Sequence, residues 1–285
     1  SMLKAGLTFS ELITTVSPSY AREIRSTEFG YGYASILEAR ADRLVGILNG
    51  IDDEAWNPRT DPHLAAHYHV DGRIRPGKAA NRKALLKELG APPSALGQHG
   101  PLIGSVGRLV QQKGVDLLLD AIPRMLERSD ARFALIGSGE ARLEQQILGL
   151  ARAHPKRFFC HIGYSERLAR RLEAGCDIFA MPSRYEPCGL NQMYSLRYGT
   201  PPVVRATGGL SDTVVDATTE NLANGSANGF VFAEADSSAL AEALERAIAQ
   251  YRRPREWMKL IKTGMRAEHG WRSSAQAYLD MYRAQ

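Results

Sequence analysis

Residues 102–114 read LIGSVGRLVQQKG, an apolar, β-prone run that passes directly into a loop with two cations. Five similar runs follow, with helical patterns between them, which is typical of βαβ units. Runs that are apolar throughout predict strands buried on both faces, as in a parallel sheet. We therefore expect an α/β fold with a Rossmann-like parallel sheet. The predicted strands are 102–106, 132–136, 158–162, 177–181, 202–204 and 229–232.

Helical patterns fill the intervals, and Leu240, Leu244 and Ile248 illustrate the spacing of a buried helical face. Pro123 lies inside the first of these helices and should kink or break it, because proline removes a backbone hydrogen bond. Residues 57–77 carry prolines and a glycine that indicate a loop before a helix over Ala79–Leu89. The other helices are expected near 115–128, 139–153, 165–174, 189–198, 209–216 and 237–251.

The first fifty residues follow a different pattern. A strand is predicted over Leu12–Val16, a helix begins at Ser17-Pro18 with the serine as its cap, and a further strand covers Leu44–Leu48. This segment is typical of the end of a second sheet. Ser1-Met2 is typical of a cloning scar, and we expect the chain to be a segment of a longer protein.

The composition is that of an ordinary folded protein, because 44% of the 285 residues are hydrophobic and 24% are charged. No apolar run reaches the ~18 residues that a membrane-spanning helix needs. Lys and Arg outnumber Asp and Glu by 36 to 31, and the excess is scattered, which favours small anionic ligands over nucleic acid. Cys160, Cys176 and Cys188 lack disulfide or zinc spacing, which favours a reducing cytoplasm.

Arg108 and Lys113 lie in the stretch 107–114, directly after the first predicted strand. Parallel strands end at the ligand-facing edge of a sheet, so both cations should lie over the crevice there. Arginine can bind phosphate oxygens in pairs and lysine is a compact point charge, so the two suit a diphosphate. The alternative is a solvated surface pair, which is the more frequent outcome for an isolated pair of cations.

The segment Met181–Leu190 also follows a strand and leads into a helix that begins near Gly189. Free amides and the dipole at a helix start form a natural seat for phosphate. Glu186 stands beside that seat, where a carboxylate needs a partner other than phosphate, and the hydroxyls of a sugar fit this need. Cys188 is either a small buried hydrophobic residue or a ligand contact.

Thr207, Gly208 and Gly209 follow a third strand, and paired glycines before a helix supply further amide donors for phosphate. Gly137-Ser138-Gly139 is a weaker signal, because no third glycine completes the dinucleotide fingerprint, and it predicts a tight turn. Three phosphate-suited loops at one sheet edge make a Rossmann-like domain without a relevant ligand the least favoured interpretation.

In this order and spacing, the motifs resemble those of bacterial glycogen synthases and plant starch synthases. The resemblance is carried by Arg108 with Lys113-Gly114, by Glu186-Pro187-Cys188-Gly189-Leu190 and by Thr207-Gly208-Gly209-Leu210. It extends over nearly the whole chain, from Thr14–Tyr20 to the segment that begins at Trp271. It implies a retaining glucosyltransferase built from two Rossmann domains, the GT-B arrangement, of which this chain would be the donor-binding half.

The resemblance also implies a domain organisation. The family's N-terminal domain, with its Lys-x-Gly-Gly loop on the acceptor side, has no counterpart in this sequence. Residues 1–48 would be a remnant of that domain, residues 49–262 the domain that binds the nucleotide-sugar donor, and residues 263–285 a C-terminal crossover helix. Such a chain would be inactive alone. Its partners would be ADP-glucose or ADP, the glucan acceptor and the missing domain, without nucleic acid or membrane, in the cytoplasm or, for a plant protein, the plastid.

In the family, glucose passes from ADP-glucose to the non-reducing end of an α-1,4-glucan with retention of configuration. By the resemblance, Arg108 and Lys113 would neutralise the charge on the departing phosphate, and Glu186 would bind the glucose hydroxyls. Because fixed cations can replace a metal, neither a metal ion nor another cofactor is expected. The other implied binding residues are Asn49 near the sugar, Tyr164 on the adenine, Cys188 near the glucose, Gly189 and Leu190 on the phosphates, and Thr207, Gly208 and Gly209 on the opposite side.

Two other functions remain open. One is a retaining transferase of the sucrose-synthase kind that uses a UDP-sugar, although the string Glu186–Leu190 argues against it. The other is a non-catalytic nucleotide-sugar sensor or carbohydrate-binding module. His63, His67 and His69 could suggest zinc, but their loop offers no fourth ligand in pattern. Asn191 departs from the family, whose members often have threonine there at a minor phosphate contact.

Overall fold

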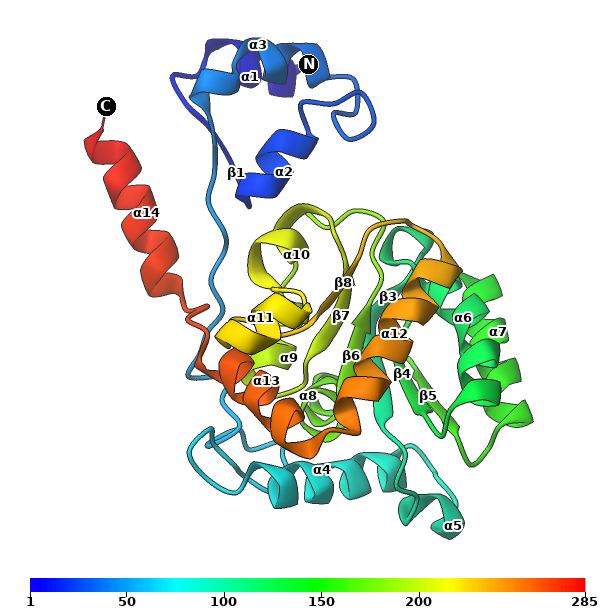
Figure 1. Ribbon diagram of the computed structural model, residues 1–285. Helices are drawn as coiled ribbons and strands as arrows, with labels where there is room; N and C mark the ends of the chain where they lie inside the picture. The colour runs from blue at the N-terminus through cyan, green and yellow to red at the C-terminus, as the bar shows by residue number, and fades with distance from the viewer. Residues whose placement is uncertain (285) are drawn as a thin grey trace.

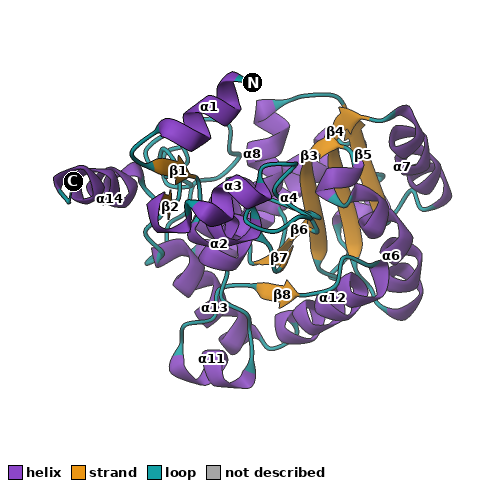
Figure 2. Cartoon of the chain, turned by 90° about the horizontal axis from the view of Figure 1, so that it is seen from above, coloured by secondary structure: helices purple, strands orange, loops and turns teal. Residues whose placement is uncertain are grey.

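The computed structural model describes residues 1–284, and its centre is a six-stranded parallel sheet with helices on both sides (Figures 1 and 2). The strand order is β5-β4-β3-β6-β7-β8, so the direction in which strands are added reverses between β3 and β6. Such a reversal opens a crevice at the carboxyl ends of the strands. The strands are β3 (Leu102–Leu109), β4 (Arg132–Gly139), β5 (Phe158–Ile162), β6 (Ile178–Met181), β7 (Pro202–Arg205) and β8 (Phe230–Phe232).

The predicted α/β class and all six predicted strands are confirmed, but β3 and β4 are longer than expected. Their pairing continues through Arg108, opposite Ser138, to Leu109, opposite Gly139. Arg108 therefore lies on the end of a strand and not in a loop. The extension is possible because Gly137 leaves room for the Gly107 carbonyl, where any Cβ would collide.

Alternation along the strands divides the core into two layers. Ile103, Phe133 and Leu135 face one layer, which is shared with α6 (Val115–Arg128), α7 (Ala141–Ala153), α12 (Ser237–Tyr251) and α13 (Pro254–Arg266). Leu102 and Ile136 face the other, together with α4 (Ile74–Glu88), α8 (Glu166–Gly175) and α10 (Gly208–Thr213). Burial on both faces explains why these strands are apolar throughout. The remaining elements beside the sheet are α5 (Pro93–Leu96), η2 (Gln111–Lys113), α9 (Asn191–Arg197) and α11 (Thr219–Asn224).

Two helix predictions need correction. Helix α6 runs unbroken through Pro123, because Leu118 and Ile122 are fully buried and hold the chain in helical form around it. Helix α4 begins at Ile74 and not at Ala79, so the predicted loop 57–77 is shorter than expected. Pro76 is compatible with this start, because the amides of a helix's first turn have no intrahelical partner to lose.

The first fifty residues form a unit around two parallel strands, both of which were predicted but are shorter than expected. β1 pairs with β2 and with no strand of the six-stranded sheet. Ser17 caps α2 by accepting a hydrogen bond from the Tyr20 amide at 2.9 Å. In Figure 1 this unit lies above the large sheet, with α2 beside α10. Its elements are α1 (Met2–Phe9), β1 (Ile13–Thr15), α2 (Pro18–Glu23), α3 (Ala34–Ala39), η1 (Ala41–Arg43) and β2 (Leu44–Gly46).

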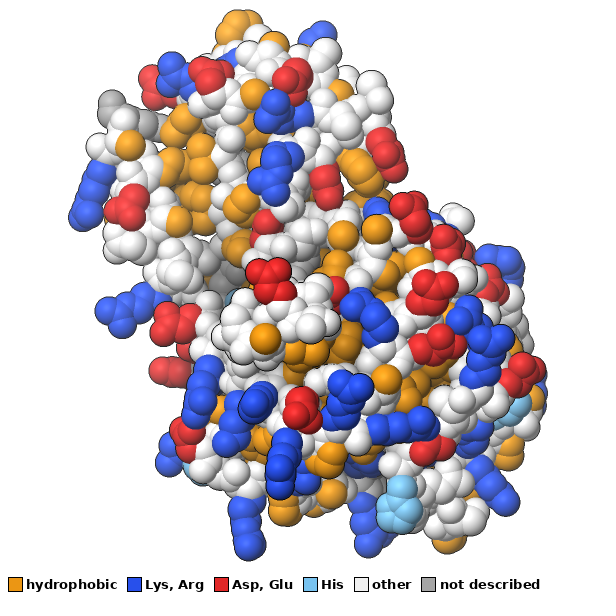
Figure 3. Space-filling model, in the orientation of Figure 1, with side chains coloured by type: hydrophobic (Ala, Val, Ile, Leu, Met, Phe, Trp, Pro, Cys, Tyr) orange, Lys and Arg blue, Asp and Glu red, His pale blue; other side chains and the backbone are white. Residues whose placement is uncertain are grey.

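Two segments connect the units, one near Ile51 and one near His269, and they contact each other. The Ile51 amide donates to the His269 carbonyl at 2.8 Å, just before α14 (Trp271–Arg283). Helix α14 then projects away from the sheet, with Trp271 51% and Tyr282 63% exposed (Figure 1). Hydrophobic side chains also gather on the unit formed by the first fifty residues, on the side next to α14 (Figure 3). No helix within residues 1–284 is long and apolar enough to cross a bilayer.

The predicted border between residues 262 and 263 lies inside α13, which continues to Arg266. The division into 1–48, 49–262 and 263–285 otherwise stays a prediction.

We expect the crossing at His269 to make stability depend on pH. Burial lowers the pKa of His269 below its usual value of 6.5, so the folded state holds the ring neutral. As pH falls below 6.5, the unfolded chain gains a proton that the folded chain resists, and the free energy of unfolding should fall. Above 6.5 this contribution is constant.

Urea unfolding of wild type and His269→Gln at several pH values between 5 and 8 measures this effect, with the exposed His99→Gln as control. The wild type should lose more stability on acidification than His269→Gln, and His99→Gln should follow the wild type. Parallel curves for wild type and His269→Gln would contradict the role of His269.

Candidate functional site

The stretch after β3 and the turn after β6 meet through an ion pair. The Lys113 ammonium lies 2.6 Å from Oε2 of Glu186, and the Ser183 hydroxyl donates to the same oxygen at 3.0 Å. The Glu186 residue is only 6% exposed, so the pair is largely removed from water. Charged pairs in this setting are held firmly, because an unpaired buried charge is costly.

Backbone contacts hold the same two segments together. The Arg184 amide donates to the Gln112 carbonyl at 2.9 Å, and the Gln112 side chain donates to the Tyr185 carbonyl at 3.2 Å. Gly114 has a φ of +66°, and a Cβ there would collide with the Pro182 carbonyl oxygen. Glycine is therefore required at this point by both conformation and space.

Arg108 lies at the exposed end of β3, near Lys113. Its guanidinium donates to the Gln112 side chain at 3.2 Å, and Arg108, Lys113 and Ser183 line the same small cavity of about 40 Å³. Both predicted cations therefore face one crevice, and one of them touches Glu186. This crevice lies where the strand order reverses.

The turn at Gly208 and Gly209, here the twin-glycine turn, packs directly on the turn that contains Glu186, the Glu186 turn. The Gly209 amide donates to the Glu186 carbonyl at 3.1 Å. A Cβ on Gly208 would collide with the Glu186 carbonyl oxygen, and one on Gly209 with that of Cys188. The structure thus brings together all three segments that the sequence predicted to converge.

The donors of the twin-glycine turn are already engaged, which the sequence did not predict. The Gly208 amide donates to Oε1 of Glu23 at 2.7 Å, and the Thr207 hydroxyl donates to the same carboxylate at 3.1 Å. Helix α10 in turn supplies Asp212, which accepts from the Ser19 amide at 2.9 Å and from its hydroxyl at 2.6 Å. Each short helix therefore places a carboxylate at the N-terminal end of the other, where the helix dipole favours negative charge.

Cys188 and Asn49 meet behind the Glu186 turn. The Cys188 thiol contacts the Asn49 backbone, and burial raises its pKa, an effect that this contact partly opposes. Its side chain packs against Ile51 and Met193. Cys188 is therefore a buried hydrophobic residue in this structure, one of the two alternatives left open by the sequence.

Gly189 has a φ of +69°, which glycine adopts without strain, and Leu190 is 37% exposed just before α9. Asn191, at the start of α9, donates from its side chain to the Val106 carbonyl at 2.9 Å. This bond fixes the beginning of α9 against the end of β3, on the two sides of the crevice.

A larger cavity of about 300 Å³ continues from Arg108 across the ends of β4 and β5. Arg108, Asn191 and Gly137 line one part of it, and Tyr164, 88% exposed, lines another. A cation and an aromatic ring at separate places in one cavity suit a ligand with a phosphate and a base.

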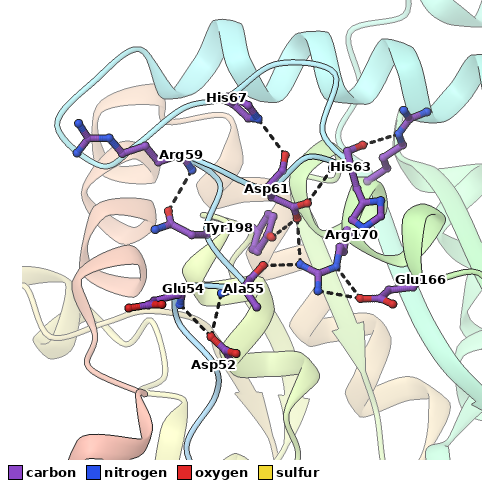
Figure 4. A network of polar contacts seen from close by, with 12 residues as sticks. Asp52, Glu54, Ala55, Arg59, Asp61, His63, His67, Glu166, Arg170 and Tyr198 are labelled. Carbon is purple, nitrogen blue, oxygen red and sulfur yellow. Dashed lines mark hydrogen bonds and ion pairs between the residues drawn. The ribbon is translucent and has the colours of Figure 1, made fainter.

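Trp56 and helix α8 form the inner wall of this cavity. The Trp56 ring stacks on Tyr194 with centroids 3.6 Å apart, and the Arg170 guanidinium lies 4.0 Å from the Trp56 ring centroid. Arg170 donates to Glu166 at 2.8 Å and to Asp61 at 3.3 Å (Figure 4). Asp61 also accepts from the Tyr198 hydroxyl. The wall is thus rigid before any ligand binds.

The three histidines considered as zinc ligands lie in the loop between Trp56 and α4. A ring nitrogen of His67 donates to the Asp61 carbonyl at 2.9 Å, and the His63 amide donates to the Asp61 side chain at 2.9 Å (Figure 4). The His69 ring lies against Gly72. Across residues 1–284, no three or more His, Cys, Asp or Glu side chains are grouped to hold a metal ion.

Sequence reasoning missed Trp56, Glu173 and Glu23. Trp56 gave one signal, an aromatic side chain within a loop that otherwise carries proline and polar residues. For Glu173 the signal was its spacing, because it follows Glu166 by seven residues and so shares the same helical face. In the structure that face supplies a further carboxyl group to the cavity wall. Glu23 gave no signal, because its partner Thr207 is 184 residues away.

Two family models match the chain. Residues 91–263 match the model "Glycosyl transferases group 1", and residues 1–39 match "Starch synthase catalytic domain". The first match covers more than half of the 285 residues and includes both cations and the Glu186 turn.

Curated relatives agree with the resemblance that the motifs indicated. The chain is 50% identical over 287 residues to a glycogen synthase of Hydrogenovibrio crunogenus, covering 100% of this chain and 58% of the relative. It is 52% identical over 283 residues to a glycogen synthase of Alkalilimnicola ehrlichii, covering 99% and 57%. The chain therefore spans somewhat more than half the length of these relatives.

Solved structures extend the comparison to the fold. The catalytic domain of starch synthase IV from Arabidopsis thaliana, bound to ADP and acarbose, matches with a TM-score of 0.89 at 38% identity, covering 99% of this chain and 57% of that one. A sucrose-phosphate synthase from Thermosynechococcus elongatus, 20% identical with a TM-score of 0.65, shares the fold alone. Such neighbours are GT-B glycosyltransferases. The chain belongs to the group 1 glycosyl transferases.

Proposed function

We propose that this chain is the donor-binding part of a glycogen or starch synthase, which transfers glucose from ADP-glucose to the non-reducing end of an α-1,4-glucan with retention of configuration. The observation that carries the proposal is the contact of Lys113 with Glu186 at 2.6 Å, in a crevice that Arg108 also lines. The names of the relatives and the ADP bound to the starch synthase IV domain support this choice of donor.

In this proposal the two cations act on the leaving group. Arg108 and Lys113 stabilise the negative charge that develops on the β-phosphate of ADP as the bond to glucose breaks. Lys113 has three donor hydrogens, so it can hold Glu186 and a phosphate oxygen together. Glu186 accepts hydrogen bonds from the glucose hydroxyls. Because the cations supply the charge, the reaction is proposed to need no metal ion and no other cofactor.

The remaining predicted residues receive supporting roles. Tyr164 stacks on the adenine at one part of the larger cavity, and Asn49 and Cys188 border the glucose from behind the Glu186 turn. Gly189 and Leu190 offer amides to the phosphates. Thr207, Gly208 and Gly209 close the opposite side, where the contact with Glu23 must loosen if their donors are to reach a phosphate.

The whole enzyme is proposed to need an acceptor-side domain that this chain does not supply. The chain alone should therefore bind ADP or ADP-glucose and lack synthase activity, since closure of two domains completes such sites. The glucan acceptor and the further domain are the proposed partners. A cytoplasmic location agrees with the bacterial relatives and is part of the proposal.

A second candidate is a related transferase or binding domain that recognises a UDP-sugar. Structures of Anabaena HepE with UDP-glucose, 18% identical to this chain with a TM-score of 0.64, show that the same fold occurs with that ligand. The two candidates differ in the base that the cavity prefers.

Titration calorimetry of the chain with ADP and with UDP separates these candidates. ADP should bind more tightly, by at least tenfold, or about 1.4 kcal/mol. Arg108→Ala should weaken binding of ADP, whereas Lys259→Ala, an exposed cation of α13 away from the crevice, should not. Tighter binding of UDP would reject the ADP-glucose assignment, and no binding of either nucleotide would reject a donor-binding role for this chain.

A further inference from the structure

A buried carboxyl on the cavity wall has no partner. Glu173 of α8 is 1% exposed, and neither of its carboxyl oxygens has a hydrogen-bond partner within residues 1–284. Its backbone carbonyl, by contrast, accepts from the Thr200 hydroxyl. Burial raises the pKa of Glu173 well above its usual value. An unsatisfied buried polar group costs stability, so its presence calls for a function.

Other buried carboxylates of the chain are paired. Asp61 accepts from Tyr198 and Arg170, Asp177 accepts from Arg82, and Glu186 is bound by Lys113. The fold therefore gives each of these carboxylates a partner, including Glu186, to which the proposed function assigns a binding role. Glu173 departs from this pattern.

The nearby cation is already committed elsewhere. Lys78 donates to the Ala174 and Tyr198 carbonyls at 3.1 and 3.2 Å, and to the Thr200 hydroxyl at 2.6 Å. It therefore joins the C-terminal ends of α8 and α9, where helix dipoles favour positive charge. It forms no ion pair with Glu173 within the part of the chain that the structure describes.

Glu173 is part of the lining of the larger cavity. Glu166, Ala169 and Glu173 share one face of α8, and all three line the cavity of about 300 Å³. Side chains in a helix lean toward its N-terminus. Glu173 therefore leans toward Glu166 along the wall of the cavity that Arg108 and Tyr164 also line.

We propose that Glu173 binds the ribose hydroxyls of the nucleotide. A nucleotide with its phosphates at Arg108 and its base at Tyr164 has its ribose between them, in the cavity that Glu173 also lines. A carboxyl group with two free oxygens can contact both hydroxyls of a vicinal diol, as acidic residues do in other nucleotide-binding Rossmann folds. This inference rests on the proposed function, because it takes the cavity to be the nucleotide site.

Removing the diol and removing the carboxyl test the contact from both sides. Calorimetry would compare ADP with 2′,3′-dideoxy-ADP on wild type, Glu173→Gln and Glu173→Met. The wild type should bind ADP about tenfold or more tightly than the dideoxy form, the sum of two modest hydrogen bonds. Glu173→Met should bind both ligands alike, and Glu173→Gln should lie between. Glu256→Met, which removes an exposed carboxylate of α13, should behave as wild type.

Thermal unfolding of the same proteins provides a second measurement. Because Glu173 is buried without a partner, Glu173→Met should keep or raise the melting temperature while losing the preference for ADP. A variant that folds, melts at or above wild type and no longer distinguishes the two ligands supports the assignment. A purely structural role would instead lower the melting temperature and leave the preference for ribose unchanged.

The outcomes separate this inference from the proposed function. If ADP binds and Glu173→Met prefers it over the dideoxy form as strongly as wild type does, the ribose contact is rejected and the nucleotide site stands. If Glu173→Met instead changes the preference between ADP and inosine diphosphate, Glu173 contacts the base, and the ribose assignment is wrong. If wild type binds no ADP, the proposed function fails, and the ribose assignment fails with it.

Discussion

Arg108→Ala and Lys113→Ala should each lower the turnover of the complete synthase by about 10²–10³-fold, the effect of losing one preorganised donor at a site of developing charge. The complete synthase would be this chain joined to the proposed acceptor-side domain. Both side chains line one crevice beside Glu186, so under the proposed function each would act on the same leaving group. The measurement is the rate of glucose transfer from ADP-glucose at saturating donor.

The two substitutions should differ in their secondary effects. Lys113→Ala leaves the Glu186 carboxylate buried without its cation, so it should also lower stability, whereas Arg108 is exposed and should act on turnover and binding alone. Lys259→Ala serves as the matched control for loss of a cation. Wild-type turnover in both Arg108→Ala and Lys113→Ala would reject the roles given to them.

Gly114→Ala should be among the most destabilising single changes at the site. Gly114 has a φ of +66°, and a Cβ there would collide with the Pro182 carbonyl oxygen, which belongs to backbone that cannot easily move. The left-handed conformation alone costs an alanine about 1–2 kcal/mol. The collision should add about 1–3 kcal/mol more, as overpacking does in cores.

Gly225→Ala is the matched control, because it places an alanine in the same left-handed backbone conformation without a steric collision. Gly225 has a φ of +78° at the end of α11, and nothing lies within 4 Å of an added Cβ. Urea unfolding should show a smaller decrease in the free energy of unfolding for Gly225→Ala than for Gly114→Ala. Calorimetry should show weaker ADP binding only for Gly114→Ala. Equal decreases in the free energy of unfolding for the two variants would show that the segments of Lys113 and Glu186 pack less closely than the structure indicates.

The sheet could be predicted because each strand carries its own signal. A strand such as Ile178–Met181 is buried on both sides, so its residues are apolar throughout and no distant contact is needed to identify it. The convergence of Arg108, Lys113 and Glu186 followed from the same rule, since parallel strands deliver their following segments to one edge.

Contacts between distant segments could not be predicted. The Glu23 contact with Thr207 depends on how two short helices dock, and nothing near Glu23 in the sequence indicates that docking. Glu173 was missed because an acidic residue in a helix is normally solvated, and only the packing of α8 buries it. Helix α6 continues through Pro123 for a related reason, because tertiary packing outweighs the local preference.

The most direct test of the central claim is a crystal structure of this chain with ADP bound. The diphosphate should lie within hydrogen-bond distance of Arg108 and Lys113, beside the Glu186 turn, with the adenine on Tyr164. ADP bound elsewhere, or in this crevice with its phosphates away from both cations, would contradict the account.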